Sequence, residues 1–137
     1  MRLDVYVKDE CQTRYNVEMQ VMQKPALQKR ARYYHSQIDM EILLSGVSYK
    51  ELPNTYVIFI CDFDPFGMEK YRYTRRCICK EVPDLKMEDG AYTIFLSTHG
   101  KNEDEEPEEL VRFLKFVGEK PSDRDKDYND PFIRRLQ

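Results

Sequence analysis

Three residues near the start of the chain, Asp4, Glu18 and Gln20, have side chains and spacing that suit a metal ion. All three carry side-chain oxygen atoms, which are the ligands that hard cations such as Mg²⁺ prefer. They fall in two short segments, residues 3–8 and 16–21, in which apolar and polar residues alternate. Such alternation is typical of half-buried strands. The sequence therefore predicts that these residues lie on two neighbouring strands.

The two segments are joined by residues 9–13, whose polar composition favours a turn, so an antiparallel hairpin is predicted. A register that aligns the apolar faces pairs Val5 with Val17 and sets Asp4 opposite Glu18. Like charges at such cross-strand positions are destabilising. A divalent cation held between the two carboxylates would relieve this repulsion. The alternative interpretation is that both acids simply face solvent on an edge hairpin.

The wider pattern resembles a known group of nucleases. Asp4 followed by Glu18-Met19-Gln20 is similar to the D…(D/E)-x-K core of the PD-(D/E)XK nuclease superfamily, with glutamine where lysine is usual. A longer ordered combination is similar to the Rpn family of recombination-promoting nucleases and transposases. Across residues 3–117, it comprises Leu3-Asp4-Val5, Tyr15 to Gln20, Arg30-Ala31-x-Tyr33-Tyr34, and Leu52-Pro53 before the run from Tyr56 to Phe63.

The resemblance implies a restriction-endonuclease-like α/β fold, in which a mixed sheet is flanked by helices. It also implies a metal-dependent endonuclease that hydrolyses nucleic-acid phosphodiesters, DNA above all, with Asp4, Glu18 and Gln20 as catalytic residues. Asp4 and Glu18 would bind Mg²⁺ or Mn²⁺, and Gln20 would position a water by hydrogen bonding although it carries no charge. Family members normally have a further stretch before the first matching strand. The resemblance therefore implies that the N-terminal part of the family domain is missing here.

A helix is predicted after the hairpin. Pro25 is well placed just before its first turn, and Gly46 stands where a C-terminal cap is expected. Apolar residues recur between them at steps of three and four, which indicates an amphipathic helix. This stripe consists of Leu27, Ala31, Tyr34, Ile38 and Ile42.

A second stripe on this helix, formed by Arg30, Tyr33 and Gln37, is the candidate nucleic-acid contact. If the helix packs on the sheet beside Gln20, this stripe points toward the same site. An arginine there can contact a phosphate with two hydrogen bonds. The alternative is that Arg30 only solvates the helix surface and that Tyr33 packs on the sheet.

The remaining pattern predicts three more strands and a second helix. The run from Tyr56 to Cys61 is almost continuously apolar, as expected for a central strand covered on both faces, and it follows the first helix as in a crossover unit. Alternation predicts strands from Glu69 to Glu81 and from Ala91 to Ser97, and an apolar stripe predicts a helix from Pro107 to Val117. We expect residues 1–117 to form the nuclease-like domain and residues 118–137 to form a flexible or loosely docked tail.

Other side chains that can do chemistry are interpreted as structural. Asp62 and Asp64 follow the central strand and are expected to cap and turn the chain. None of the four cysteines forms a CxxC pair, which argues against a zinc knuckle, and we expect reduced packing residues. Neither His35 nor His99 has an evident partner, and no nucleotide-binding glycine loop is present, so no nucleotide cofactor is expected.

Composition narrows the class of protein further. With 137 residues, of which 41% are hydrophobic, the chain suits one domain with one sizeable core. No apolar stretch approaches the ~20 residues of a membrane span, and no signal peptide opens the chain, so a cytoplasmic protein is expected. The net charge is −3, whereas dedicated DNA-binding domains are often strongly basic. If the protein binds nucleic acid, the positive potential that attracts the phosphates must therefore come from a local group of basic residues.

Two alternatives to a nuclease follow from the same sequence. The first is a catalytically inactive nuclease-fold module that acts in protein interaction or oligomerisation, for example as a homodimer that covers an exposed sheet edge. The second is a sheet that binds RNA or DNA without chemistry, whose binding would be sensitive to salt but independent of metal.

Overall fold

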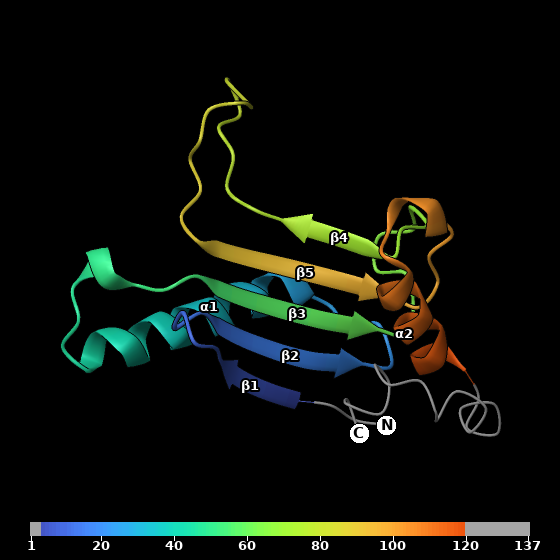
Figure 1. Cartoon of the computed structure of the whole chain (residues 1–137), viewed down its shortest axis with the longest axis horizontal. Helices are drawn as coiled ribbons and strands as arrows, with labels where there is room; N and C mark the ends of the chain where they lie inside the picture. Colours follow the sequence, from blue (N-terminus) through green and yellow to red (C-terminus); the bar gives the residue numbers. More distant parts are fainter. Residues whose placement is uncertain (1–3, 120–137) are drawn as a thin grey trace.

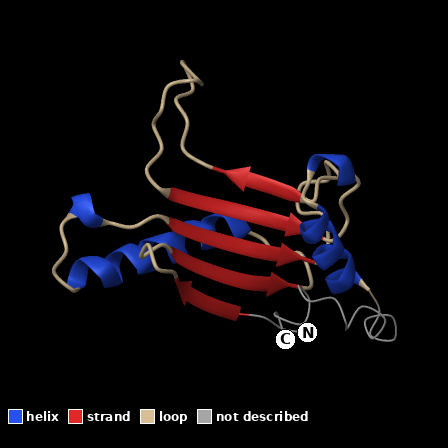
Figure 2. Ribbon diagram, in the orientation of Figure 1, coloured by secondary structure: helices blue, strands red, loops and turns tan. Residues whose placement is uncertain are grey.

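A single mixed sheet forms the centre of the computed structural model, which describes residues 4–119 (Figures 1 and 2). The strand order is β1-β2-β3-β5-β4. Two longer helices and two short 3-10 helices complete this described part of the chain. The strands are β1 (Asp4–Lys8), β2 (Arg14–Gln20), β3 (Thr55–Cys61), β4 (Arg72–Arg75) and β5 (Ala91–Ser97). The helices are α1 (Leu27–Leu44), η1 (Tyr49–Glu51), η2 (Glu103–Glu105) and α2 (Glu108–Gly118).

The predicted hairpin is confirmed together with its register. β1 and β2 are antiparallel, and Val5 pairs with Val17 while Asp4 pairs with Glu18. The turn is held by Asp9, whose Oδ1 accepts the backbone N–H groups of Cys11 and Thr13 at 2.9 and 3.0 Å. The chain between the strands is thereby fixed, and with it the positions that face each other across the hairpin.

The next connection confirms the predicted crossover. β2 leads through α1 to β3, and β2, β3 and β5 run parallel as the centre of the sheet. Helix α1 lies across one face of the sheet, and α2 packs near the carboxyl ends of the parallel strands (Figure 1). The mixed α/β sheet flanked by helices is therefore the fold class that the sequence predicts.

Residues of β3 divide the core into two clusters, one on each face of the sheet. Val57 and Phe59 are fully buried on the α1 side, where they pack with Leu27, Ala31, Cys61 and Phe95. Ile60 points the other way and packs with Tyr71, Val111, Phe113, Leu114 and Val117. Alternate residues of one strand thus contribute to opposite faces, which is why its sequence is almost continuously apolar.

The strand predicted from Glu69 to Glu81 is wrong beyond Arg75. β4 covers only Arg72–Arg75, and the chain then extends away from the sheet as a long loop before β5 begins (Figure 1). A strand needs a neighbour that supplies its backbone hydrogen bonds. Arg75 pairs with Thr93, which is only two residues from the start of β5. Beyond Arg75, β5 therefore has almost no residues left that could supply backbone hydrogen bonds to β4.

Of the two aspartates after β3, Asp64 turns the chain as the sequence predicts, whereas Asp62 contacts a side chain that follows β5. Asp64 accepts backbone N–H groups from Phe66, Gly67 and Glu69 as well as the hydroxyl of Tyr73. Burial raises the pKa of Asp64, but these hydrogen bonds outweigh it, and the pKa lies below its ordinary value. Asp62 accepts the hydroxyl of Thr98 at 2.9 Å.

The cysteine prediction holds only in part. All four cysteines are free thiols, as expected. Cys61 is a buried packing residue, but Cys11 and Cys77 are exposed and do not pack in the core. The reason is that Cys11 lies in the β1–β2 turn and Cys77 in the loop that leaves the sheet.

His35 has partners that the sequence did not reveal. It lies on the buried face of α1, with Nδ1 2.8 Å from Oγ1 of Thr55 and Nε2 3.1 Å from Oγ1 of Thr93. Burial lowers the pKa of His35, and the charge of Arg75 lowers it further. The lowered pKa favours the neutral imidazole, which links α1 to Thr55 of β3 and Thr93 of β5.

This burial predicts a pH-dependent stability. The pKa of His35 in the folded state lies below the unfolded value of about 6.5, so the unfolded chain takes up a proton first as the pH falls. The contribution of His35 is complete above about pH 6.5 and is lost as the pH falls through the folded-state pKa. We expect the free energy of unfolding, measured with urea between about pH 7.5 and 5, to fall more steeply with decreasing pH in the wild type than in His35→Gln. Equal slopes in the two proteins would contradict this origin.

Two further expectations concern membrane spans and the C-terminal tail. Neither α1 nor α2 has the length and apolar composition needed to cross a membrane. The tail predicted from residue 118 lies outside the described residues, apart from Gly118, which ends α2, and Glu119.

Candidate active site

Strand β2 presents polar residues to the face of the sheet that α1 covers. Asn16, Glu18 and Gln20 alternate along it, and Gln20 is almost fully buried, with 3% of its surface exposed. Arg30 approaches from the first turns of α1, and its Nη1 lies 3.5 Å from Oε1 of Glu18. The Glu18 side chain is only 19% exposed. The strand and the helix therefore bring a carboxylate, an amide and a guanidinium together.

Two oxygen atoms of this group are buried without a hydrogen-bond partner among residues 4–119. They are Oε2 of Glu18 and Oε1 of Gln20, which belong to residues two apart on the same strand. A buried polar atom that makes no hydrogen bond costs free energy, and the cost is larger when the group is charged. Oxygen atoms in this condition suit the neighbourhood of a hard cation, which binds through oxygen.

Asp4 is the third residue that the sequence places in this site. The structure describes it through its backbone, which pairs with Glu18 across the hairpin. The two-residue period of β1 assigns position 4 to the strand face of Tyr6. The juxtaposition of positions 4 and 18 in the register is thus established, and the role of Asp4 as a ligand stays a prediction.

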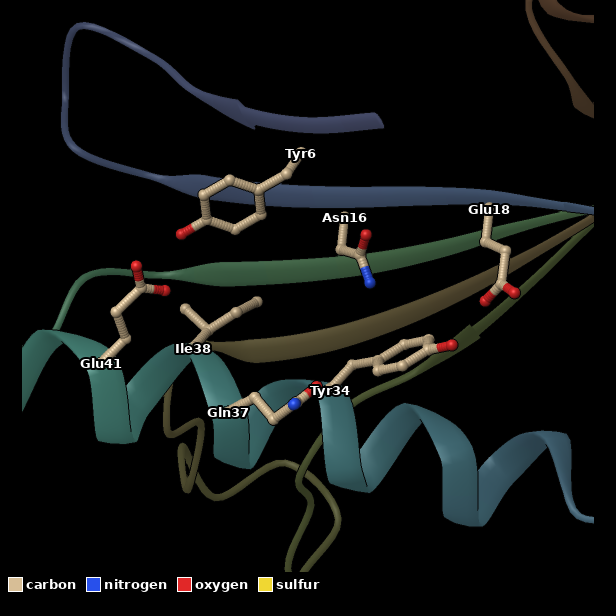
Figure 3. A pocket seen from close by; sticks show the side chains of 7 residues that line it. All are labelled: Tyr6, Asn16, Glu18, Tyr34, Gln37, Ile38 and Glu41. Atoms are coloured by element: carbon tan, nitrogen blue, oxygen red, sulfur yellow. The ribbon is translucent and has the colours of Figure 1, made fainter. Parts of the chain in front are cut away.

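A cavity of about 590 Å³ adjoins Glu18, between the hairpin and α1 (Figure 3). Figure 3 shows Glu18 at one end of it and Glu41 at the other. Tyr6 reaches in from β1, and Tyr34 lies on the opposite wall, which α1 forms. The complete lining consists of Tyr6, Asn16, Glu18, Tyr34, Gln37, Ile38 and Glu41.

The three residues predicted to bind nucleic acid occupy different positions around this cavity. Arg30 contacts Glu18, as described above, and its side chain is 36% exposed. Gln37 lines the cavity and donates a hydrogen bond from Nε2 to the hydroxyl of Tyr33 at 3.1 Å. Tyr33 itself is 59% exposed and does not line the cavity. The alternative that Tyr33 packs on the sheet is wrong, because Tyr34 takes that place against Phe59, with ring centroids 6.4 Å apart.

Sequence reasoning missed five residues of the cavity wall: Tyr6, Asn16, Tyr34, Ile38 and Glu41. Signals for two of them were present. Asn16 shares the strand face of Glu18, and Glu41 follows Gln37 by four residues on the helix, which is one turn. The place of Tyr6 on the cavity wall follows only from its pairing with Asn16 across the hairpin. Tyr34 and Ile38 belong to the apolar stripe of the helix, and their place on the cavity wall depends on how α1 packs.

A metal ion at this site would have few protein ligands. Within the described part of the chain, no group of three or more His, Cys, Asp or Glu side chains could hold a metal ion. Mg²⁺ is commonly bound through only one or two carboxylates, and waters and substrate phosphates complete its shell. The carboxylates at positions 4 and 18 fit that style of binding, and the amide oxygen of Gln20 can accept a hydrogen bond from a metal-bound water.

Comparison with known protein families shows a match over most of the chain. The family model for PD-(D/E)XK nuclease family transposases matches residues 1–132 of the chain. Searches of curated proteins and of solved structures gave no match.

Proposed function

The chain belongs to the PD-(D/E)XK nuclease family transposases, and from this premise we propose that it is a metal-dependent endonuclease that hydrolyses phosphodiester bonds of DNA. Nucleases of this kind generally use divalent metals, so the proposed cofactor is Mg²⁺ or Mn²⁺. The observation that carries the proposal is the pair of buried oxygen atoms without partners, Oε2 of Glu18 and Oε1 of Gln20. Their cost to the folded protein is understandable if, during function, a cation satisfies the oxygen of Glu18 and a water bound to that cation donates a hydrogen bond to the oxygen of Gln20.

The proposed roles follow from what each side chain can do. Asp4 and Glu18 hold the cation, which when bound polarises the phosphate and makes a water more acidic. Gln20 orients a water through its amide, because it has neither a charge nor useful basicity. Arg30 supplies the positive charge that a lysine at position 20 would otherwise bring, and its guanidinium suits a phosphate oxygen.

The role of Arg30 leads to a prediction about substrate affinity. A hydrogen bond to a charged group contributes about 1.5–3 kcal/mol, so we expect Arg30→Ala to raise the KM for DNA by at least about tenfold. Arg32→Ala removes an equal charge from the same helix at an exposed position that does not line the cavity. It serves as the matched control and is expected to change KM much less. Similar values of KM for the two variants would contradict the assignment.

The proposed function is tested by the Asp4→Ala variant. We expect it to lose Mg²⁺-dependent cleavage of plasmid and oligonucleotide DNA while its circular dichroism spectrum stays that of the wild type. RNA of the same sequence is assayed in parallel, because the family implies nucleic acid and the choice of DNA is part of the proposal. Cleavage by Asp4→Ala at the wild-type rate would refute the proposed site.

A second candidate function is favoured by the edge of the sheet. β1 pairs only with β2 among the described strands, and Tyr6 and Val7 on it are 51% and 43% exposed. An edge strand of this kind can pair with a second copy, which would suit an inactive module that acts through oligomerisation. A dimer in light scattering that Val7→Lys converts to a monomer, together with no cleavage by the wild type, would favour this function over the nuclease.

A further inference from the structure

The cavity beside Glu18 has a chemistry that phosphodiester hydrolysis alone does not use. Its volume of about 590 Å³ lies within the range typical of small-molecule sites. The aromatic rings of Tyr6 and Tyr34 belong to opposite walls, and Ile38 lies one turn along α1 from Tyr34 on the helix side (Figure 3). Tyr34 is backed by Phe59 in the core, so its wall is firmly supported. Such walls suit a flat ligand with a π-face.

Polar groups of the lining can hydrogen-bond the edge of such a ligand. Asn16 comes from the middle of β2, and within residues 4–119 its side chain makes no hydrogen bond that the structure shows. Its amide offers both a donor and an acceptor. Glu41 at the far end is an acceptor only. An amide and a carboxylate are also the side chains that proteins use to recognise amino groups on bases.

The charge of the lining excludes a phosphate from the cavity itself. Carboxylates stand at both ends, Glu18 and Glu41, and no lysine or arginine is part of the wall. An anion inside would be repelled from both ends. Arg30, in contrast, lies beside Glu18, where a cation would also be held. A phosphate therefore belongs at the Glu18 end, and a neutral planar group belongs inside.

We propose that the cavity binds one nucleobase of the DNA strand, beside the phosphate held at Glu18 and Arg30. This inference rests on the proposed nuclease function and names its substrate more closely. The base stacks on Tyr6 and Tyr34, Asn16 bonds its edge, and Glu41 accepts a hydrogen from an exocyclic amino group. Adenine, cytosine and guanine carry such a group, whereas thymine does not. A base in this position is out of its helical stack, so the substrate is single-stranded or locally opened DNA.

The test measures binding and cleavage separately on single-stranded oligonucleotides in which one position at a time lacks its base. Fluorescence anisotropy with Ca²⁺ gives the affinity, and Mn²⁺ then gives the cleavage rate. We expect one abasic position to weaken wild-type binding about tenfold. Tyr6→Ala is expected to bind the intact strand more weakly than the wild type by a similar factor. It should bind the abasic strand as tightly as it binds the intact strand. Tyr6→Phe keeps the ring and should behave as the wild type.

A matched control separates this cavity from the rest of the surface. Tyr49→Ala removes an exposed tyrosine, 81% accessible, from η1 and is expected to keep both the wild-type affinity and its dependence on the base. Two results would overturn the base site and leave the nuclease function intact. One is cleavage that depends on no single base, and the other is a loss of affinity in Tyr6→Ala that adds fully to the loss caused by the abasic position. If the wild type shows neither binding nor cleavage, both the base site and the proposed function are overturned.

Discussion

Replacing Glu18 by glutamine is expected to reduce Mn²⁺-dependent DNA cleavage by about a thousandfold. The substitution keeps the size of the side chain and removes the charge that holds the cation. A bound metal contributes several kcal/mol of transition-state stabilisation, and each 1.36 kcal/mol corresponds to a factor of ten in rate. The measurement is single-turnover cleavage at saturating protein, which separates chemistry from product release.

The stability of Glu18→Gln provides a second readout for the same variant. The wild type buries a carboxylate oxygen without a partner in the described chain, and its contact with Arg30 is long, at 3.5 Å. Removing the charge should therefore leave the melting temperature unchanged or raise it, as expected where function is kept at the expense of stability. Glu10→Gln, at an exposed position in the β1–β2 turn, is the control and should change neither rate nor stability. Full activity in Glu18→Gln would mean that Glu18 is not a ligand.

The second large effect concerns the core that supports the site. Phe59 is fully buried in β3, and its ring stacks on Phe95 with centroids 5.5 Å apart and lies 6.4 Å from that of Tyr34. We expect Phe59→Ala to lower the free energy of unfolding by about 3–5 kcal/mol, because it removes a large apolar side chain and leaves a cavity. Urea denaturation followed by circular dichroism measures this loss.

Phe59→Leu distinguishes loss of packing from loss of the aromatic ring. Leucine retains much of the apolar volume, so its cost in stability should be clearly smaller than that of alanine. Both variants remove the ring that backs Tyr34, so both should weaken the dependence of DNA binding on the base in the cavity. A loss below about 1 kcal/mol for Phe59→Ala would show that this part of the core is not closely packed.

The hairpin is the element that sequence reasoning predicted most completely, and its physics explains why. Alternation along both strands leaves only one choice of face, since a slip of one residue would expose the apolar set. The turn at Asp9 is local and fixes which positions face each other. The pairing of Asp4 with Glu18 follows from these two constraints alone. Whether the pair holds a cation does not follow from either of them.

The features that the sequence did not reveal depend on packing between distant segments. His35 reads as a polar interruption of a helix, and its burial depends on Thr55 and Thr93, which lie 20 and 58 residues further along the chain. The strand predicted beyond Arg75 failed for a related reason, since alternation does not show where a neighbouring strand ends. The cavity beside Glu18 likewise exists only because α1 packs on β3 and leaves a space between itself and the hairpin.

Isothermal titration of Mn²⁺ into the wild-type protein, repeated with Glu18→Gln and Asp4→Asn, tests the central claim most directly. We expect binding to the wild type and loss of that binding in both variants, since each removes one of the two carboxylates proposed to hold the cation. Circular dichroism confirms that all three proteins are folded. Absence of binding to the folded wild type, or unchanged binding in both variants, would contradict a metal site at Asp4 and Glu18.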